Sequence, residues 1–151
     1  MQKALRYTRI PTMTRPPFEL LDHTADVGAL AYGRTLAEAF ENAALAMFSV
    51  MADLSTVAEE EIRDIDVEGD SSEELLVAWL SELLYLSDTQ QMVFRRFAID
   101  QMDHHLRGRA WGERIDRDRH ALGSGVKAVT RHMLAIEESE GLHRIQVIFD
   151  I

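Results

Sequence analysis

Two stretches of the chain repeat apolar residues at helical spacing, and each begins with a capping box. Thr35 with Glu38 opens the first stretch, and Ser71 with Glu74 opens the second. The apolar positions that follow are Leu36, Phe40, Ala43, Ala44, Met47, Phe48 and Met51 in the first, and Leu75, Leu76, Trp79, Leu80, Leu83 and Leu84 in the second. This pattern predicts two amphipathic helices, the first of about 17 residues.

The other apolar segments are short or alternate with polar residues, as is typical of strands. They lie at residues 18–22, 27–32, 65–67, 93–99, 106–112, 126–136 and 145–149. The small residues Gly108, Ala110 and Gly112 predict the close approach of another layer. Residues 115–124 form a predicted loop. Together the elements predict an α+β fold, a two-layer sandwich with two main helices packed on a mostly antiparallel sheet of about six or seven strands.

The first 17 residues differ in composition from the rest of the chain. They contain four cations, no acid and all three prolines (Lys3, Arg6, Arg9, Arg15, Pro11, Pro16 and Pro17). We expect residues 1–17 to be a basic, proline-containing N-terminal extension and residues 18–151 to form a single domain. An organellar transit peptide is an alternative, although the extension has no Ser and no clear amphipathic stripe.

The charge balance narrows the classes of function. Lys and Arg number 16 against 26 Asp and Glu, which gives a net charge of −10. Such a chain repels phosphate backbones, so we expect no direct, stable nucleic-acid binding. There is no Cys, which excludes disulfides and Cys-based metal sites. No apolar run approaches the length of a membrane span, and we expect a cytoplasmic protein without membrane association.

Three groups of polar residues are candidates for chemistry. The corner at residues 22–26 (DHTAD) holds two carboxylates, an imidazole and a hydroxyl at the end of a strand, and is either a functional site or a turn whose side chains satisfy the backbone. The segment at residues 116–120 has metal-like spacing but lacks the Gly and distal Glu of a calcium loop, which favours a solvated loop. The adjacent His104 and His105 would point to opposite sides of a strand, as surface histidines.

Five blocks of the chain closely resemble, in order and spacing, those of the archease family. The blocks are residues 21–28 (LDHTADVG), 35–44 (TLAEAFENAA), 79–85 (WLSELLY), 126–132 (VKAVTRH) and 147–151 (VIFDI). One departure is Arg131, where that family commonly has an aromatic residue. The resemblance implies a non-catalytic cofactor of RtcB-type RNA ligases, which join RNA ends in tRNA splicing or RNA repair with GTP and manganese. Members promote guanylylation of the ligase and its multiple turnover.

The resemblance also implies a set of site residues. Asp26, Asp150 and the terminal carboxylate of Ile151 would bind a divalent metal, with calcium favoured over manganese or magnesium. Lys127 and His23 would be functional residues that face the partner. The chemistry is consistent, because crowded carboxylates repel each other without a cation and oxygen-only ligands suit these metals. The acidic domain at residues 18–151 also complements the basic surface expected of an RNA ligase.

Two other classes of function stay open on the sequence. One is a metal-dependent hydrolase in which Asp26 and Asp150 bind the metal and His23 acts as general base. The other is a chaperone-like interaction module without a metal. No nucleophile elbow, phosphate-binding loop or dinucleotide fingerprint accompanies the corner.

Overall fold

The computed structural model describes residues 16–22 and 26–151, so the predictions for His23 and for most of the N-terminal extension lie outside the described residues. The strands are β1 (Phe18–Asp22), β2 (Asp26–Gly33), β3 (Glu61–Glu68), β4 (Met92–Met102), β5 (His105–Arg114), β6 (Ala128–Ser139) and β7 (Leu142–Asp150). The helices are α2 (Leu36–Met51), α3 (Ser72–Gln90) and the short 3-10 turn η2 (Leu54–Thr56). None of the helices in the described part of the chain is long and apolar enough to cross a membrane.

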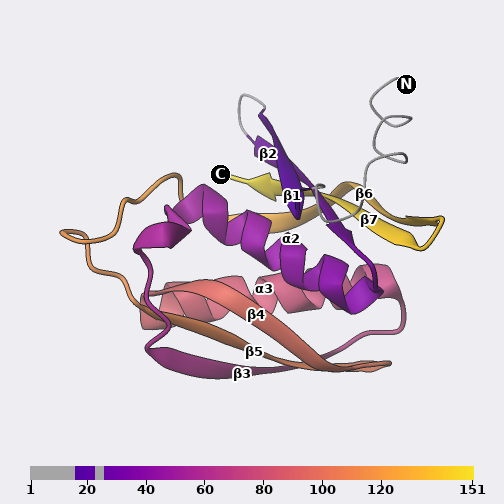
Figure 1. The fold of residues 1–151 in the computed structure, drawn as a ribbon, viewed down its shortest axis with the longest axis horizontal. Coiled ribbons are helices and arrows are strands. Elements are labelled where there is room, and N and C mark those ends of the chain that lie inside the picture. Colours follow the sequence, from indigo (N-terminus) through magenta and orange to yellow (C-terminus); the bar gives the residue numbers. More distant parts are fainter. Residues whose placement is uncertain (1–15, 23–25) are drawn as a thin grey trace.

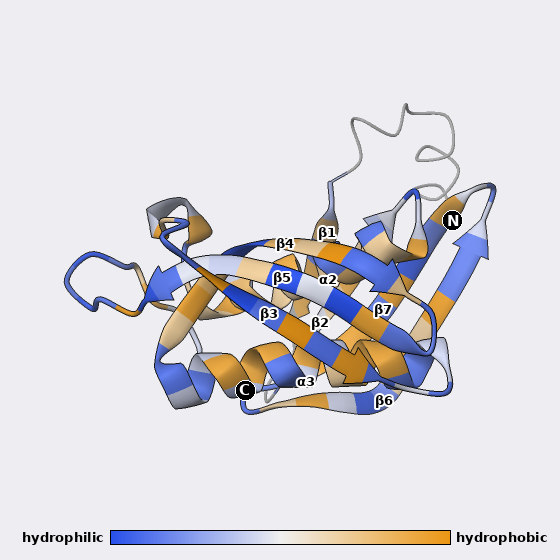
Figure 2. Ribbon diagram, turned by 90° about the horizontal axis from the view of Figure 1, so that it is seen from below, coloured by the Kyte–Doolittle hydropathy of each residue, from blue (hydrophilic) through white to orange (hydrophobic). Residues whose placement is uncertain are grey.

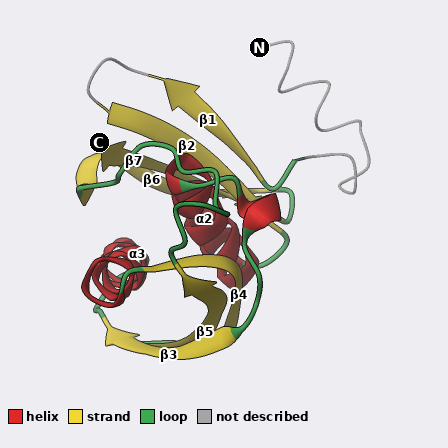
Figure 3. Cartoon of the chain, turned by 90° about the vertical axis from the view of Figure 1, so that its left-hand side faces the viewer, coloured by secondary structure: helices red, strands yellow, loops and turns green. Residues whose placement is uncertain are grey.

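The two main helices lie between two antiparallel sheets (Figures 1 and 3). One sheet has four strands in the order β1-β2-β7-β6, and the other has three in the order β3-β5-β4. Helix α2 contacts β2 on one side and β4 on the other, while α3 contacts β6 and β3. The α+β class, the two helices and the antiparallel pairing are confirmed. The strands are divided between the two sheets, so both broad apolar helix surfaces are covered from two sides.

Both helices begin where the capping boxes place them. The Thr35 hydroxyl accepts a hydrogen bond from the Glu38 backbone N–H at 3.0 Å, and Ser71 accepts one from Glu74 at 3.1 Å. Each glutamate in turn accepts a backbone N–H from the residue just before the cap. At both helix starts the cap side chain therefore satisfies one first-turn N–H, and the glutamate satisfies the N–H just before the cap.

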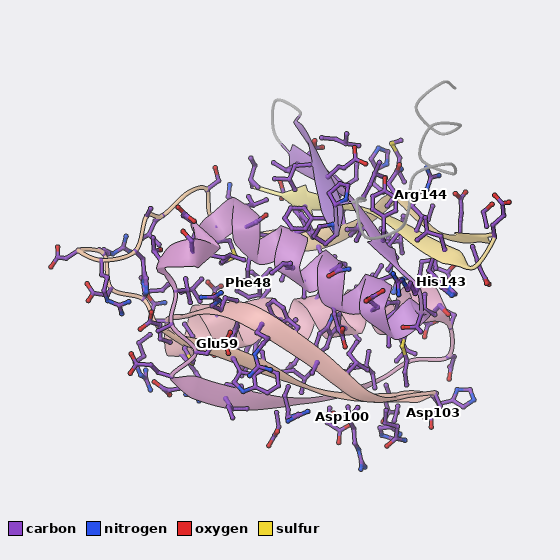
Figure 4. The ribbon with its side chains drawn as sticks, in the orientation of Figure 1. Phe48, Glu59, Asp100, Asp103, His143 and Arg144 are labelled. Atoms are coloured by element: carbon purple, nitrogen blue, oxygen red, sulfur yellow. The ribbon has the colours of Figure 1, made fainter. Side chains whose placement is uncertain are left out.

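The core joins the helices to the three-stranded sheet. Phe48 on α2 meets Phe94 edge-on and stacks on Phe97, with ring centroids 5.5 Å and 5.6 Å apart. Figure 4 shows Phe48 directed from α2 toward β4. The fully buried Trp79 of α3 donates its indole N–H to the carbonyl of Phe40 at 3.0 Å, which ties the two helices together. A buried indole donor without such a partner would be unfavourable.

The outer face of the three-stranded sheet is covered by its own side chains. The Arg96 guanidinium lies 3.7 Å from the Trp111 ring centre, and Arg109 lies 4.9 Å from it. Each arginine is also held by a carboxylate, Arg96 by Glu59 at 2.8 Å and Arg109 by Asp100 at 2.9 Å. Figure 2 views this face and shows hydrophilic and hydrophobic positions alternating along β3. These paired charges leave the face polar while Trp111 is buried.

The small residues of β5 allow the close approach that the sequence predicts. A Cβ atom on Gly108 would lie 3.1 Å from the Trp79 ring of α3 and 2.7 Å from the Ala98 carbonyl oxygen. On Gly112 it would lie 2.0 Å from the Val93 carbonyl oxygen and 2.7 Å from the Phe94 Cα. The crowding therefore comes from α3 at Gly108 and from the backbone of the neighbouring strand at both positions.

Gly112→Ala should destabilise the fold by about 1–3 kcal/mol, because backbone atoms cannot give way as a flexible side chain can. Gly125→Ala is the matched control, since nothing lies within 4 Å of its added Cβ. Urea unfolding of both variants checks this. Equal stability of Gly112→Ala and the wild type would show that β4 and β5 tolerate a wider spacing.

Candidate functional site

Two carboxylates lie opposite each other at one end of the four-stranded sheet. Asp26 is the first residue of β2 and Asp150 the last of β7, and the two are direct partners in the antiparallel register. Figure 1 shows the C-terminal end of β7 lying beside the start of β2. Side chains of directly paired residues lie on the same face of a sheet, with Cβ atoms about 4.5–5.5 Å apart. Like charges so placed repel each other.

The carboxylate of Asp26 contains an unsatisfied oxygen. Its Oδ1 atom is buried and has no hydrogen-bond partner, and it is the one such side-chain atom in the part of the chain that the structure describes. A buried, unpaired acceptor costs roughly 1–3 kcal/mol, and more when it is charged. A divalent cation bound between Asp26 and Asp150 would both satisfy this oxygen and remove the repulsion. The oxygen ligands suit calcium, magnesium or manganese.

A third segment of the chain reaches the same point. Ala128, the first residue of β6, pairs with Asp150 on the side away from Asp26. The backbone N–H of Lys127 donates to the Asp150 carbonyl at 2.7 Å, and the Lys127 side chain is exposed. The fold therefore brings Asp26, Lys127 and Asp150 together from segments far apart in the sequence. Ile151 follows directly, and its partly buried side chain packs against the core.

The other candidate site residues do not lie with Asp26 and Asp150. Within residues 16–22 and 26–151, no three His, Asp or Glu side chains gather in a way that could hold a metal. Asp116 and Asp118 are exposed, and Asp116 Oδ1 accepts the Asp118 backbone N–H at 3.0 Å, as in a solvated loop. His104 and His105 are both exposed. His23 is outside the described residues.

Sequence reasoning missed a buried polar cluster between the end of β5 and the predicted solvated loop. Glu113 is 4% exposed and His120 is also 4% exposed. Glu113 accepts hydrogen bonds from the Arg119 guanidinium at 2.5 and 2.8 Å, from the Ala58 backbone N–H at 2.6 Å and from His120 Nε2 at 2.8 Å. The Asp116 N–H donates to His120 Nδ1, so the hydrogen of this imidazole is on Nε2. No sequence pattern marks this burial, because Glu and His are common in exposed strand ends and loops.

The cluster fixes the course of the loop that leads to Lys127. Beyond His120 the loop is held on the C-terminal end of α2 by backbone hydrogen bonds, from Asp53 N–H to the Ala121 carbonyl at 2.8 Å and from Gly123 N–H to the Met51 carbonyl at 2.8 Å. The start of β6 is thus approached by an anchored segment. This anchoring helps to position Lys127 at the end of β7, next to Asp150.

Comparison with known proteins places these residues in a family. The model of the Archease protein family (MTH1598/TM1083) matches residues 18–151. A protein archease from Sulfurisphaera tokodaii is 43% identical over 136 residues, covering 89% of this chain and 98% of that protein. One from Methanothermobacter thermautotrophicus is 46% identical over 138 residues with the same coverage. This chain belongs to the archease family.

Solved structures agree with the archease assignment. The solution structure of protein 1598 from Methanobacterium thermoautotrophicum matches with a TM-score of 0.74 and 44% identity, covering 89% of this chain and 99% of that one. A crystal structure from Thermotoga maritima, described as an archease and possible chaperone, matches with a TM-score of 0.62 over 91% of this chain and 98% of that one. It is 18% identical, so that likeness concerns the fold alone.

The Glu113 cluster should make the stability of this archease-family chain depend on pH. The hydrogen bonds from Arg119, and then those from Ala58 and His120, hold the pKa of Glu113 well below its ordinary value of 4.5. A lowered folded-state pKa adds stability above the unfolded-state pKa, and this stability is lost as the pH falls toward the folded-state value. Glu113→Gln should cost about 1–3 kcal/mol at pH 7, and the difference from wild type should shrink between about pH 5 and pH 3.

Chemical unfolding across this pH range, with the exposed loop variant Asp118→Asn as control, checks the prediction. A difference between Glu113→Gln and wild type that stays constant with pH would contradict it.

Proposed function

We propose that the chain is a protein activator of an RtcB-type RNA ligase in the cytoplasm, where it promotes ligase guanylylation and multiple turnover in tRNA splicing or RNA repair. We propose further that Asp26, Asp150 and the terminal carboxylate of Ile151 hold a divalent cation, calcium before manganese or magnesium. The observation that carries the metal proposal is the buried, unpartnered Asp26 Oδ1 in register with Asp150. The archease membership carries the choice of partner.

The cation would connect the chain to its partner. Calcium takes about six to eight oxygen ligands, which is more than these residues supply, so water or a group from the partner completes its shell. The bound cation would neutralise the facing carboxylates and fix the ends of β2 and β7. This part of the surface would then be rigid before the partner arrives, which reduces the entropy lost on binding.

Lys127 and the overall charge favour a protein partner. Lys127 is exposed at the residue whose backbone N–H bonds to Asp150, where it can contact the ligase or its nucleotide. The net charge of −10 complements a basic, RNA-binding enzyme and speeds their encounter.

The direct test is RNA joining by an RtcB-type ligase with GTP and manganese, with and without the chain. We expect the chain alone to join no RNA and to raise the number of turnovers and the rate of ligase guanylylation when it is added. Ligase activity that is unchanged by the chain would contradict the proposal. Hydrolysis of RNA or nucleotide by the chain alone would instead support the metal-dependent hydrolase.

Asp26→Asn should remove the calcium response while keeping the fold. Calcium should raise the melting temperature of the wild type by mass action and leave that of the variant unchanged, because one of the facing anions is gone. Without calcium the variant should be at least as stable as the wild type, since the repulsion with Asp150 is relieved. Thermal unfolding with and without calcium measures both effects. Asp116→Asn is the control, and an equal calcium shift in Asp26→Asn and wild type would place the metal elsewhere.

Lys127→Ala should fold normally and lose most of the ligase activation. The side chain is exposed, and substitutions at such positions usually change stability by less than about 0.5 kcal/mol. Arg117→Ala removes another exposed cation and is the matched control. The rate of ligase guanylylation, measured with each variant, tests this prediction. Full activation by folded Lys127→Ala would remove this residue from the functional site.

Extending the chain beyond Ile151 by two glycines should weaken calcium binding. The extension replaces the terminal anion with a neutral amide carbonyl and crowds the space beside Asp150. The pairing of β7 should survive, so the circular dichroism spectrum should stay native. Calcium titration calorimetry compares the two forms, and equal affinities would show that the terminal carboxylate is not a ligand.

A further inference from the structure

The loop between β5 and β6 is long, and hydrogen bonds to neighbouring segments hold it along most of its length. Residues 115–127, all within the described part of the chain, form no helix or strand of their own. Figure 1 shows this loop passing the C-terminal end of α2. Backbone bonds of 2.7–3.1 Å join Ile115 to Gln91, Ala121 to Asp53, Gly123 to Met51, Ser124 to Val50 and Lys127 to Asp150. Long loops in compact domains are usually either functional or disordered, and the fixed course of this loop favours a function.

His120 fastens the first half of this loop from the inside. Its side chain is fully buried, and its two ring nitrogens make different bonds. Nδ1 accepts the Asp116 backbone N–H at 2.9 Å, which closes the turn at residues 116–120. Nε2 donates to Glu113, near the end of β5, at 2.8 Å. One side chain thus shapes the turn and attaches it to the three-stranded sheet.

Glu113 joins the loop to a further segment of the chain. It accepts the Ala58 backbone N–H at 2.6 Å, and Arg119, which it also holds, donates to the Thr56 carbonyl at 3.4 Å. A buried charged network often stabilises a fold no more than apolar residues of similar volume would, but it accepts only one geometry. The cluster therefore selects one course for the loop.

The other end of the loop delivers Lys127 to the proposed site. Val126, just before it, is 6% exposed and belongs to the core. The Lys127 N–H then donates to the Asp150 carbonyl, and β6 begins at the next residue. Glu113 and His120 are both buried, so they affect a partner only through the residues that they hold.

We infer that Glu113 and His120 are positioning residues for ligase activation, which fix residues 116–127 so that Lys127 is held at Asp150 before the ligase binds. This inference rests on the proposed function and extends its site to two buried residues that do not touch the partner. A side chain presented by a fixed backbone loses less entropy on binding, so looseness in the loop weakens what Lys127 contributes.

The competing explanation is that the cluster only stabilises the fold. The pairing of β6 with β7 would then suffice to place Lys127, and the loop could loosen without any effect on this residue. The two explanations differ in what happens to Lys127 when the bond between His120 and Glu113 is lost in a protein that is still folded.

His120→Asn and His120→Gln separate the two explanations. The Asn side chain can still accept the Asp116 N–H but is too short to reach Glu113, whereas the longer Gln side chain can still donate to Glu113. Asn42→Ala is the matched control. It removes a side-chain hydrogen bond of 2.6 Å to the Tyr32 carbonyl, at the opposite end of β2 from Asp26.

Amide hydrogen exchange of the chain alone measures the positioning. We expect exchange at the Lys127 amide to become about tenfold faster in His120→Asn. It should stay near the wild-type rate in His120→Gln and in Asn42→Ala. Thermal unfolding confirms that each variant is folded at the temperature used. Wild-type exchange at Lys127 in folded His120→Asn would overturn the inference.

A double-mutant cycle with Lys127→Ala connects the positioning to activation. At a saturating concentration of the chain, His120→Asn should lower the rate of ligase guanylylation about tenfold, and His120→Gln should restore most of it. His120→Asn should have little further effect when residue 127 is already Ala, because both changes act through the same side chain.

Additive losses in this cycle, or full activation by folded His120→Asn, would overturn the inference. Absence of activation by the wild-type chain would instead contradict the proposed function, and with it the role of the pair in activation. The exchange rates, measured without the ligase, would still decide whether Glu113 and His120 fix the position of Lys127.

Discussion

The register between β2 and β7 is the constraint on which the proposed site depends. It places Asp26 directly opposite Asp150, at the cost of repulsion between two carboxylates. The register is not free to change, because Ala29, Ala31 and Val147 face the core from these strands and are fully buried. A slip by one residue would turn these positions to the other face of the sheet. The hydrophobic core thus holds the carboxylate pair together, and a bound cation would remove the strain that this creates.

The remaining structure positions the third segment of the site. The paired β7 and β6 bring Lys127 to Asp150, and the loop before Lys127 is anchored by the Glu113 cluster and by backbone bonds to the end of α2. The two sheets present different outer surfaces. The three-stranded sheet is covered by arginines that are paired with carboxylates and stacked on Trp111. The exposed Arg131 and Met133 lie instead on β6, the strand that begins at the carboxylate pair.

Local patterns predicted the elements better than their arrangement. The capping boxes at Thr35 and Ser71 placed both helix starts, because a cap is a contact between residues close in sequence. The division of the strands between two sheets could not be read in the same way, since it depends on which helix face each strand covers. The register shift in β6 between Thr130 and Ala135 lies within an apparently continuous apolar segment, and nothing in the sequence around Met133 marks its positive φ.

The candidate site shows the same limit. The polar corner indicated Asp26, but its pairing with Asp150 requires strands that are more than a hundred residues apart to meet in one register. From the residues alone a structural turn was the favoured interpretation of the corner, and the link to Asp150, Ile151 and Lys127 came from the resemblance to the archease family. The burial of Glu113 and His120 is also a tertiary effect, since the loop folds back over the sheet end to enclose them.

The most direct test of the central claim is a calcium titration of the isotope-labelled chain followed by amide NMR. The carboxylate pair predicts that the amide signals of Asp26, Lys127, Asp150 and Ile151 shift together and saturate at one equivalent of calcium. The signals of Asp116 and Asp118 should stay in place. Unchanged signals at Asp26 and Asp150, or shifts confined to Asp116 and Asp118, would contradict a cation held between β2 and β7.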